Sequence, residues 1–200
     1  GEIGPAGGTL VSADGRLELE VPAGALASDT TLSITPITNH APGGVGIAYR
    51  FEPDGLQFRE PVTLAFQYTD EDLRGGEPTL LGGAFQTADG HWQWLHDPVV
   101  DPVDERVEVT TTHFTDFVLV EGARLWPGQA DVRVGETVQL EVAVCYVPSV
   151  DPDDLMPLAL DCDSSRTGRA PRVAVREWAV NGAPGGSSST GTVARSEERR

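Results

Sequence analysis

The sequence contains no lysine, because all 14 of its basic residues are arginine. Without lysine there is no Lys–Asn isopeptide cross-link, no Schiff-base lysine and no phosphate-loop lysine. Cysteine is almost as scarce: Cys145 and Cys162 are its only two, and no Cys-x-x-Cys motif or histidine cluster stands near them, which argues against zinc. No apolar run approaches the roughly eighteen residues of a membrane helix, so we expect no membrane span.

Positive charge is also scarce, and the formal net charge is −17. Residues 1–120 hold 19 acidic residues and 5 arginines, a net of −14, whereas residues 121–200 hold 12 and 9, a net of −3. Such an acidic first part repels a phosphate backbone, so we expect no nucleic-acid partner.

Turn-forming residues are abundant, with 23 Gly and 15 Pro. No segment keeps an apolar period of 3.6 residues, so the composition favours short strands over helices. The 39% hydrophobic content is enough for the core of a β-sandwich. We therefore expect an all-β protein.

The segment 7–34 has the layout strand, tight turn, strand, Pro/Gly corner and strand. Its first turn is Asp14–Gly15, where glycine supplies the positive φ that a short hairpin needs. In the strand that follows, Leu17, Leu19 and Val21 alternate with charged residues and therefore share one face.

Two later segments also carry motifs that matter for the fold. Residues 49–64 read as a strand, a Pro-x-Gly turn, an aromatic residue, Pro-Val and a strand, and residues 107–120 form a closing segment that contains His113-Phe114-Thr115-Asp116-Phe117. Together with segment 7–34, these blocks resemble the ZU-five module, which is found in ankyrins, netrin receptors and many bacterial surface proteins. The resemblance covers roughly the first 120 residues and implies a β-sandwich.

We predict a ZU-five-like sandwich over residues 1–121, built from nine short strands. The predicted strands are 8–11, 16–21, 30–36, 48–51, 62–68, 80–86, 92–95, 106–112 and 117–120.

Residues 122–200 are predicted to form a second β-sandwich module. Strands at 130–134 and 137–147, joined by a turn at Gly135–Glu136, resemble the opening of bacterial immunoglobulin-like repeats, and Trp178 resembles their core tryptophan. An Asp/Pro-rich insertion is expected at 148–172. The repeat is short of its late strands, so we expect an incomplete module within a larger protein.

The sharpest chemical hypothesis concerns His113, Phe114 and Thr115, which resemble the self-cleavage site of some ZU-five proteins. The Thr115 hydroxyl would attack the carbonyl of Phe114 while His113 accepts its proton, and water would open the resulting ester. The competing interpretation places Phe114 in the core and His113 and Thr115 on the other face of an ordinary strand.

Metal and disulfide sites are the remaining candidates. Weak calcium ligands lie in acidic clusters, but none has the order of an EF-hand loop; these residues are Asp151, Asp153, Asp154, Asp161 and Asp163. In an exported protein Cys145 and Cys162 would form a disulfide, and the alternative is two free thiols. Trp92, Trp94 and His96 alternate, which could present aromatic rings to a sugar or place them partly in the core.

Taken together, the sequence predicts a non-enzymatic structural or protein-interaction module of an exported bacterial protein, secreted or at the cell surface. Self-processing between Phe114 and Thr115 and a calcium-stabilised adhesin segment are the alternatives. We expect no cofactor, and the expected partners are other domains of the same protein or another surface protein.

Overall fold

The computed structural model describes residues 1–73, 76–126, 130–144, 156–158, 179–180, 183–189 and 191–193. The chain divides into two compact units, Gly1–Ala170 and Pro171–Arg200. The first unit is an antiparallel β-sandwich, which confirms the predicted fold class. The predicted domain boundary near residue 121 stays a prediction.

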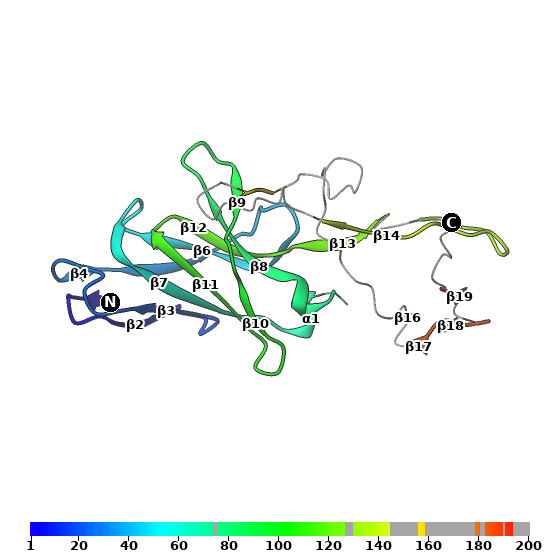
Figure 1. Ribbon diagram of the computed structural model, residues 1–200, viewed down its shortest axis with the longest axis horizontal. Helices are drawn as coiled ribbons and strands as arrows, with labels where there is room; N and C mark the ends of the chain where they lie inside the picture. Colours follow the sequence, from blue (N-terminus) through cyan, green and yellow to red (C-terminus); the bar gives the residue numbers. More distant parts are fainter. Residues whose placement is uncertain are drawn as a thin grey trace. The chain divides into compact units, whose positions relative to one another are not determined.

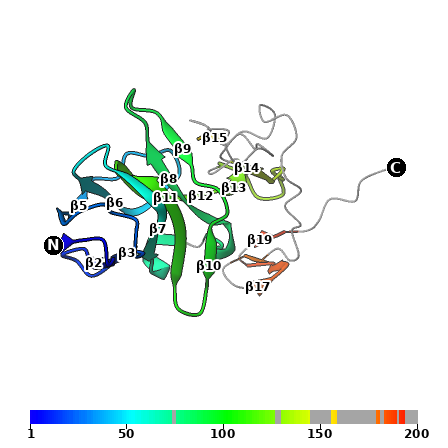
Figure 2. The same ribbon diagram turned by 60° about the vertical axis from the view of Figure 1, so that its left-hand side comes forward.

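One layer of the sandwich is a five-stranded antiparallel sheet. Its order is β10 (Val99–Asp101), β11 (Arg106–His113), β7 (Gln57–Gln67), β3 (Leu17–Val21) and β2 (Gly8–Val11). Figure 2 shows β10, β11 and β7 side by side.

The other layer is a six-stranded antiparallel sheet. Its order is β15 (Met156–Pro157), β9 (Trp92–Trp94), β8 (Leu81–Gln86), β12 (Asp116–Glu121), β6 (Gly44–Glu52) and β5 (Ser33–Ile37). A short pair, β1 (Glu2–Ile3) with β4 (Thr30–Thr31), lies at the N-terminal end (Figure 1).

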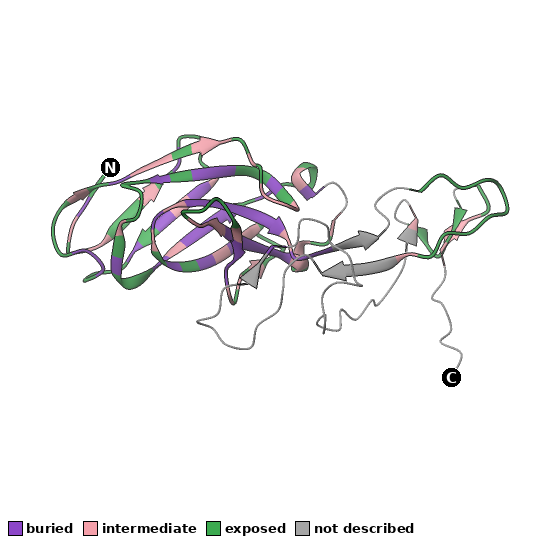
Figure 3. Ribbon diagram, turned by 90° about the horizontal axis from the view of Figure 1, so that it is seen from above, coloured by how far each residue is buried: buried purple, intermediate pink, exposed green. Residues whose placement is uncertain are grey.

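The core lies between the two sheets, and strands such as β3 and β11 bury alternate residues in it (Figure 3). Leu17, Leu19 and Val21 are 0–2% exposed, while Glu18 and Glu20 are not buried, as the alternation predicts. Phe58 and Phe114 are buried as well, and the ring of Phe114 lies 4.9 Å from that of Phe58, centroid to centroid.

The turn between β2 and β3 contains the predicted glycine. Gly15 has a φ of 73°, and its N–H donates to the Ser12 carbonyl at 2.9 Å. The Ser12 N–H in turn donates to the Leu17 carbonyl at 2.8 Å. This turn ends the sheet's outer hairpin and places Asp14 beside the neighbouring layer.

Two short helices lie between β7 and β8: α1 (Asp70–Leu73) and the 3-10 helix η1 (Pro78–Leu80). Thr69 caps α1, because its hydroxyl accepts from the Asp72 N–H at 3.3 Å while the Asp72 carboxylate accepts from the Thr69 N–H at 2.9 Å. Among the described residues, no helix is long and apolar enough to cross a membrane.

After the sandwich, β13 (Ala123–Trp126) pairs with β14 (Glu141–Val144). The predicted strand at 130–134 is wrong: residues 130–140 form no strand, although the predicted turn is present, with the Glu136 N–H donating to the Arg133 carbonyl at 3.0 Å. Three valines within the two predicted strands are exposed and do not pack on an apolar surface: Val132, Val134 and Val138.

The second unit contributes four two-residue strands among its described residues. Here β16 (Ala179–Val180) pairs with β17 (Ala183–Pro184), and β18 (Gly186–Ser187) pairs with β19 (Gly191–Thr192). The immunoglobulin-like assignment of residues 122–200 stays a prediction, and Trp178 lies outside the described residues.

Candidate functional site

The predicted self-cleavage residues lie where the chain crosses from one sheet to the other. Strand β11 ends at His113 and β12 begins at Asp116, so Phe114 and Thr115 make the crossing. The backbone of Phe114 is held from the turn that precedes β7: its N–H donates to the Leu56 carbonyl at 2.9 Å, and its carbonyl accepts from the Gly55 N–H at 3.0 Å. The Pro-x-Gly turn of the sequence therefore supports this crossing.

His113 lies half-buried among aromatic rings. Its ring packs edge-on against Phe85 at 5.0 Å and lies 6.0 Å from the ring of Phe117, centroid to centroid. Its Nδ1 lies 3.3 Å from the hydroxyl of Thr111. Burial lowers the pKa of His113 below its ordinary value, and the charge of Asp54 opposes this only in part. The neutral imidazole is therefore favoured.

Thr115 is not hydrogen-bonded to His113. Its hydroxyl donates to the Gln86 carbonyl at 2.7 Å, whereas the imidazole of His113 is hydrogen-bonded to the Thr111 hydroxyl. A neutral imidazole and a carbonyl that already accepts from Gly55 suit the cleavage hypothesis. The hydrogen bond from the Thr115 hydroxyl to Gln86 does not suit this hypothesis, because general-base catalysis needs the base within hydrogen-bond reach of that hydroxyl. The arrangement matches the framework interpretation more closely.

An ion pair that the sequence did not predict lies directly after this crossing between the sheets. Both side-chain oxygens of Asp116 accept from Arg50, from Nε at 2.9 Å and from Nη2 at 2.8 Å. The two residues are opposite each other in the β12–β6 ladder. The hydrogen bond and charge of Asp116 raise the pKa of Arg50. An aligned Arg–carboxylate fork fixes the register of the ladder at this point.

A second polar network joins the two sheets around Asp14. Its carboxylate accepts from the Ser12 hydroxyl at 2.5 Å, the Arg16 N–H at 3.1 Å and the Tyr49 hydroxyl at 2.9 Å. Burial alone would raise the pKa of Asp14, but these hydrogen bonds lower it overall. Because Tyr49 comes from β6 and Asp14 from the β2–β3 turn, the network fastens one layer to the other.

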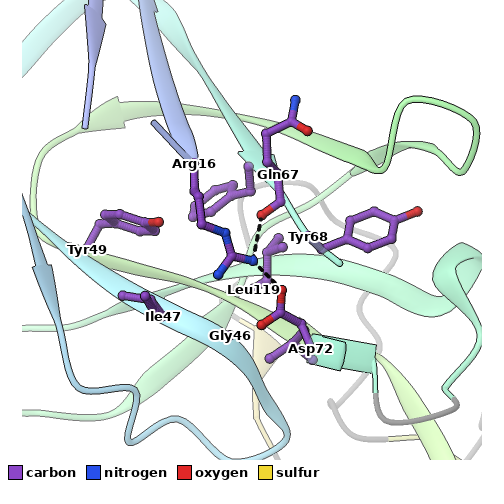
Figure 4. A pocket seen from close by; sticks show the side chains of 10 residues that line it. Arg16, Gly46, Ile47, Tyr49, Gln67, Tyr68, Asp72 and Leu119 are labelled. Atoms are coloured by element: carbon purple, nitrogen blue, oxygen red, sulfur yellow. Dashed lines mark hydrogen bonds and ion pairs between the residues drawn. The ribbon is translucent and has the colours of Figure 1, made fainter. Parts of the chain in front are cut away.

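A small hollow lies beside this network, between Arg16 and β6 (Figure 4). Arg16 donates to the Asp72 carboxylate and, at 3.3 Å, to the Gln67 carbonyl. Burial would raise the pKa of Asp72, but hydrogen bonds from Thr69 and Arg16 lower it. The space left is about that of one water molecule, too small for an organic ligand.

The tryptophans of β9 do not form an exposed sugar platform. Trp94 is only 7% exposed, and its ring lies over Gly82 and Gly122 on the outer face of the six-stranded sheet. A Cβ atom at Gly82 would stand 2.2 Å from that ring, so glycine is required there. Leu158 is buried in the same apolar cluster, a contact that the sequence did not indicate.

The remaining predicted sites lie outside the described residues, and no statement about their structure follows. These are the disulfide pair and the acidic calcium candidates: Cys145, Cys162, Asp151, Asp153, Asp154, Asp161 and Asp163. Within the part of the chain that the structure describes, no group of three or more His, Cys, Asp or Glu side chains could hold a metal ion.

The fold and its polar ties define a two-sheet antiparallel β-sandwich. No protein-family model matches the chain, and a search of the curated proteins finds no match. The resemblance to ZU-five modules therefore stays a prediction from the sequence motifs.

Proposed function

We propose that this chain is a non-enzymatic structural module, a rigid spacer that joins other modules in series within an exported bacterial protein. The proposal is carried by one observation: residue 1 and the end of β12 lie at opposite ends of the sandwich. Segments attached at these two points leave in opposite directions, as a spacer requires.

The length of strand β6 gives the separation between residue 1 and the end of β12. At one of its ends Glu52 pairs with Ser33, and the adjacent Leu32 carbonyl accepts from the N-terminal amine at 2.6 Å. At its other end Gly44 pairs with Val120, the next-to-last residue of β12. A nine-residue strand is about 27 Å long. In Figure 1 the N-terminus and β13 accordingly lie on opposite sides of the sandwich.

The position of β12 suits a module that transmits tension. It lies between β6 and β8, bonded to both, and its axis runs toward the point at which the chain leaves the sandwich. Antiparallel hydrogen bonds are perpendicular to the strands, so a pull along β12 loads both ladders at once. The aligned Arg50–Asp116 pair strengthens the start of the same ladder.

The location in an exported bacterial protein is supported by sequence: basic residues that are all arginine, a strongly acidic first part and the resemblance to surface modules. The hydrogen bond from Thr115 to Gln86 favours the spacer over self-processing. The calcium-stabilised alternative predicts that EDTA lowers Tm, and a Tm unchanged by EDTA removes it.

Single-molecule pulling tests the proposal on the full chain. With handles at residue 1 and at the C-terminus, the sandwich is sheared along β12, and we expect a high unfolding force. The control moves the second handle to the exposed turn at Gly90. This turn lies at the same end of the sandwich as residue 1, because it follows Phe85 and Gln86 of β8, and Phe85 pairs with Phe117 near the start of β12. This geometry peels strands apart one bond at a time.

The spacer role predicts a several-fold higher force for the end-to-end pull than for the Gly90 pull. Equal forces in the two geometries, or a weaker end-to-end response, would contradict it.

A further inference from the structure

Strand β9 would be an edge of the six-stranded sheet if β15 did not cover it. Met156 pairs with Trp94 and Pro157 with Gln93, and the Leu158 N–H donates to the Trp92 carbonyl at 3.1 Å. An uncovered edge strand presents free backbone donors and acceptors to any extended segment. Three residues from a distant part of the chain thus complete the sheet.

The backbone of β9 divides its bonds between two neighbours. The His91 carbonyl and the Leu95 N–H bond toward β8, at 2.8 Å each, whereas the Trp92 carbonyl bonds outward to Leu158. Residue 157 therefore lies at a non-hydrogen-bonded position of this pairing, where a backbone N–H would point away from β9. Proline has no N–H to offer there, so the covering strand fits β9 and also ends the sheet.

An apolar anchor accompanies this backbone pairing. Leu158 is 8% exposed and joins a cluster on the outer face of the sheet. The fully or largely buried members of this cluster are Ala48, Ala84, Trp94, Val118, Val120 and Leu158, with Ile37, Ala41 and Trp92 packed against them. The small side chains leave a surface on which one aliphatic residue and the indole of Trp94 both fit.

We propose that the β9 edge and this outer face are a docking site for the segment Met156–Leu158, and that a second copy of the chain can supply the segment. Two copies would then exchange their β15 strands and form a symmetric dimer. The segment of another copy has the sequence already seated on β9, so it makes the same pairing and buries the same leucine.

Two features make exchange feasible. The docked segment is only three residues long, so few bonds must open before it can move. The stretch between Val144 and Met156 can span roughly 40 Å when extended, enough to reach a neighbouring molecule. The proposal does not depend on the spacer role, which concerns the two ends of the sandwich.

Light scattering coupled to gel filtration tests the exchange on the full chain. Samples are partly unfolded in urea and refolded at increasing concentration, which allows segments to re-pair. We expect the dimer fraction of the wild-type chain to rise with concentration and the dimer to be lost in Leu158→Asp. Val134→Asp, at an exposed position, is the matched control and should dimerise like the wild type.

A peptide of residues 152–162 supplies the second measurement. It should compete with the wild-type dimer and bind the full-length Leu158→Asp variant, whose docking site is vacated, with a change in tryptophan fluorescence. The same peptide carrying Leu158→Asp should do neither. A wild-type chain that stays monomeric throughout, a dimer equally populated in Leu158→Asp, or a dimer that the peptide leaves intact would overturn the proposal.

Discussion

The sandwich and residues 130–140 contain similar alternating valines but differ in what those valines bury. In the sandwich, alternate positions such as Val107 and Val109 on β11 are 0–1% exposed because a second sheet covers them. In residues 130–140, Val132 and Val134 alternate in the same way and are 53% and 108% exposed. Alternation therefore marks a strand only where an opposing apolar layer exists to receive it.

The largest expected effect comes from removing an aromatic side chain at the crossing between the sheets. Phe114→Ala leaves a cavity against Phe51 and Phe58, so we expect a loss of about 3–5 kcal/mol in the free energy of unfolding. Val134→Ala should change it by less than about 0.5 kcal/mol. Urea denaturation measures both, and similar losses would erase the distinction between the two regions.

A pair of buried tyrosines sharpens the comparison within the sandwich. The Tyr49 hydroxyl donates to Asp14, whereas the buried Tyr68 hydroxyl has no hydrogen-bond partner. Tyr49→Phe should cost about 1 kcal/mol. Tyr68→Phe should leave stability unchanged or raise it by up to about 1 kcal/mol, because it removes an unsatisfied polar group. Equal losses in the two variants would show that the network around Asp14 does not stabilise the fold.

A smaller effect is expected from the titration of His113. Its pKa is lowered in the folded chain from an ordinary 6.5, so the unfolded chain takes up the proton first. Stability should therefore fall as the pH drops below about 6.5 toward the lower folded pKa. His113→Gln should flatten this part of the curve, as measured by denaturation at several pH values. An unchanged slope in the variant would mean that another group is responsible.

The smallest expected effect is on the integrity of the chain. Because the Thr115 hydroxyl is bonded to Gln86, we expect a single band of 21.2 kDa in denaturing electrophoresis, even after ageing. Thr115→Ala should look the same. Fragments with a new N-terminus at Thr115, present in the wild type and absent in Thr115→Ala, would establish self-processing instead.

Much of the sandwich could be predicted because its signals are local. The alternation in β3, the glycine turn at Gly15 and the burial of Phe114 each depend on a few neighbouring residues. The polar ties could not be predicted in this way. Asp14 and Tyr49, or Arg50 and Asp116, are far apart in sequence, and no pattern in the sequence distinguishes them from ordinary surface charges.

The covering strand was missed for a related reason. Met156–Pro157 lies in a stretch rich in aspartate and proline, a composition typical of loops. It forms a strand because it pairs with β9, which would otherwise be the edge of the sheet. The converse error occurred at residues 130–134, where a good local pattern has no partner. In both places the pairing partner decides the secondary structure, and a single sequence does not contain that information.

Amide hydrogen exchange tests the central claim most directly, namely that β12 is the inner strand spanning the sandwich while residues 130–140 lie outside it. The amides of Phe117, Val118, Leu119 and Val120 should exchange only through global unfolding, and those of residues 130–140 within the fastest class. Exchange of β12 at the rate of residues 130–140 would contradict the account.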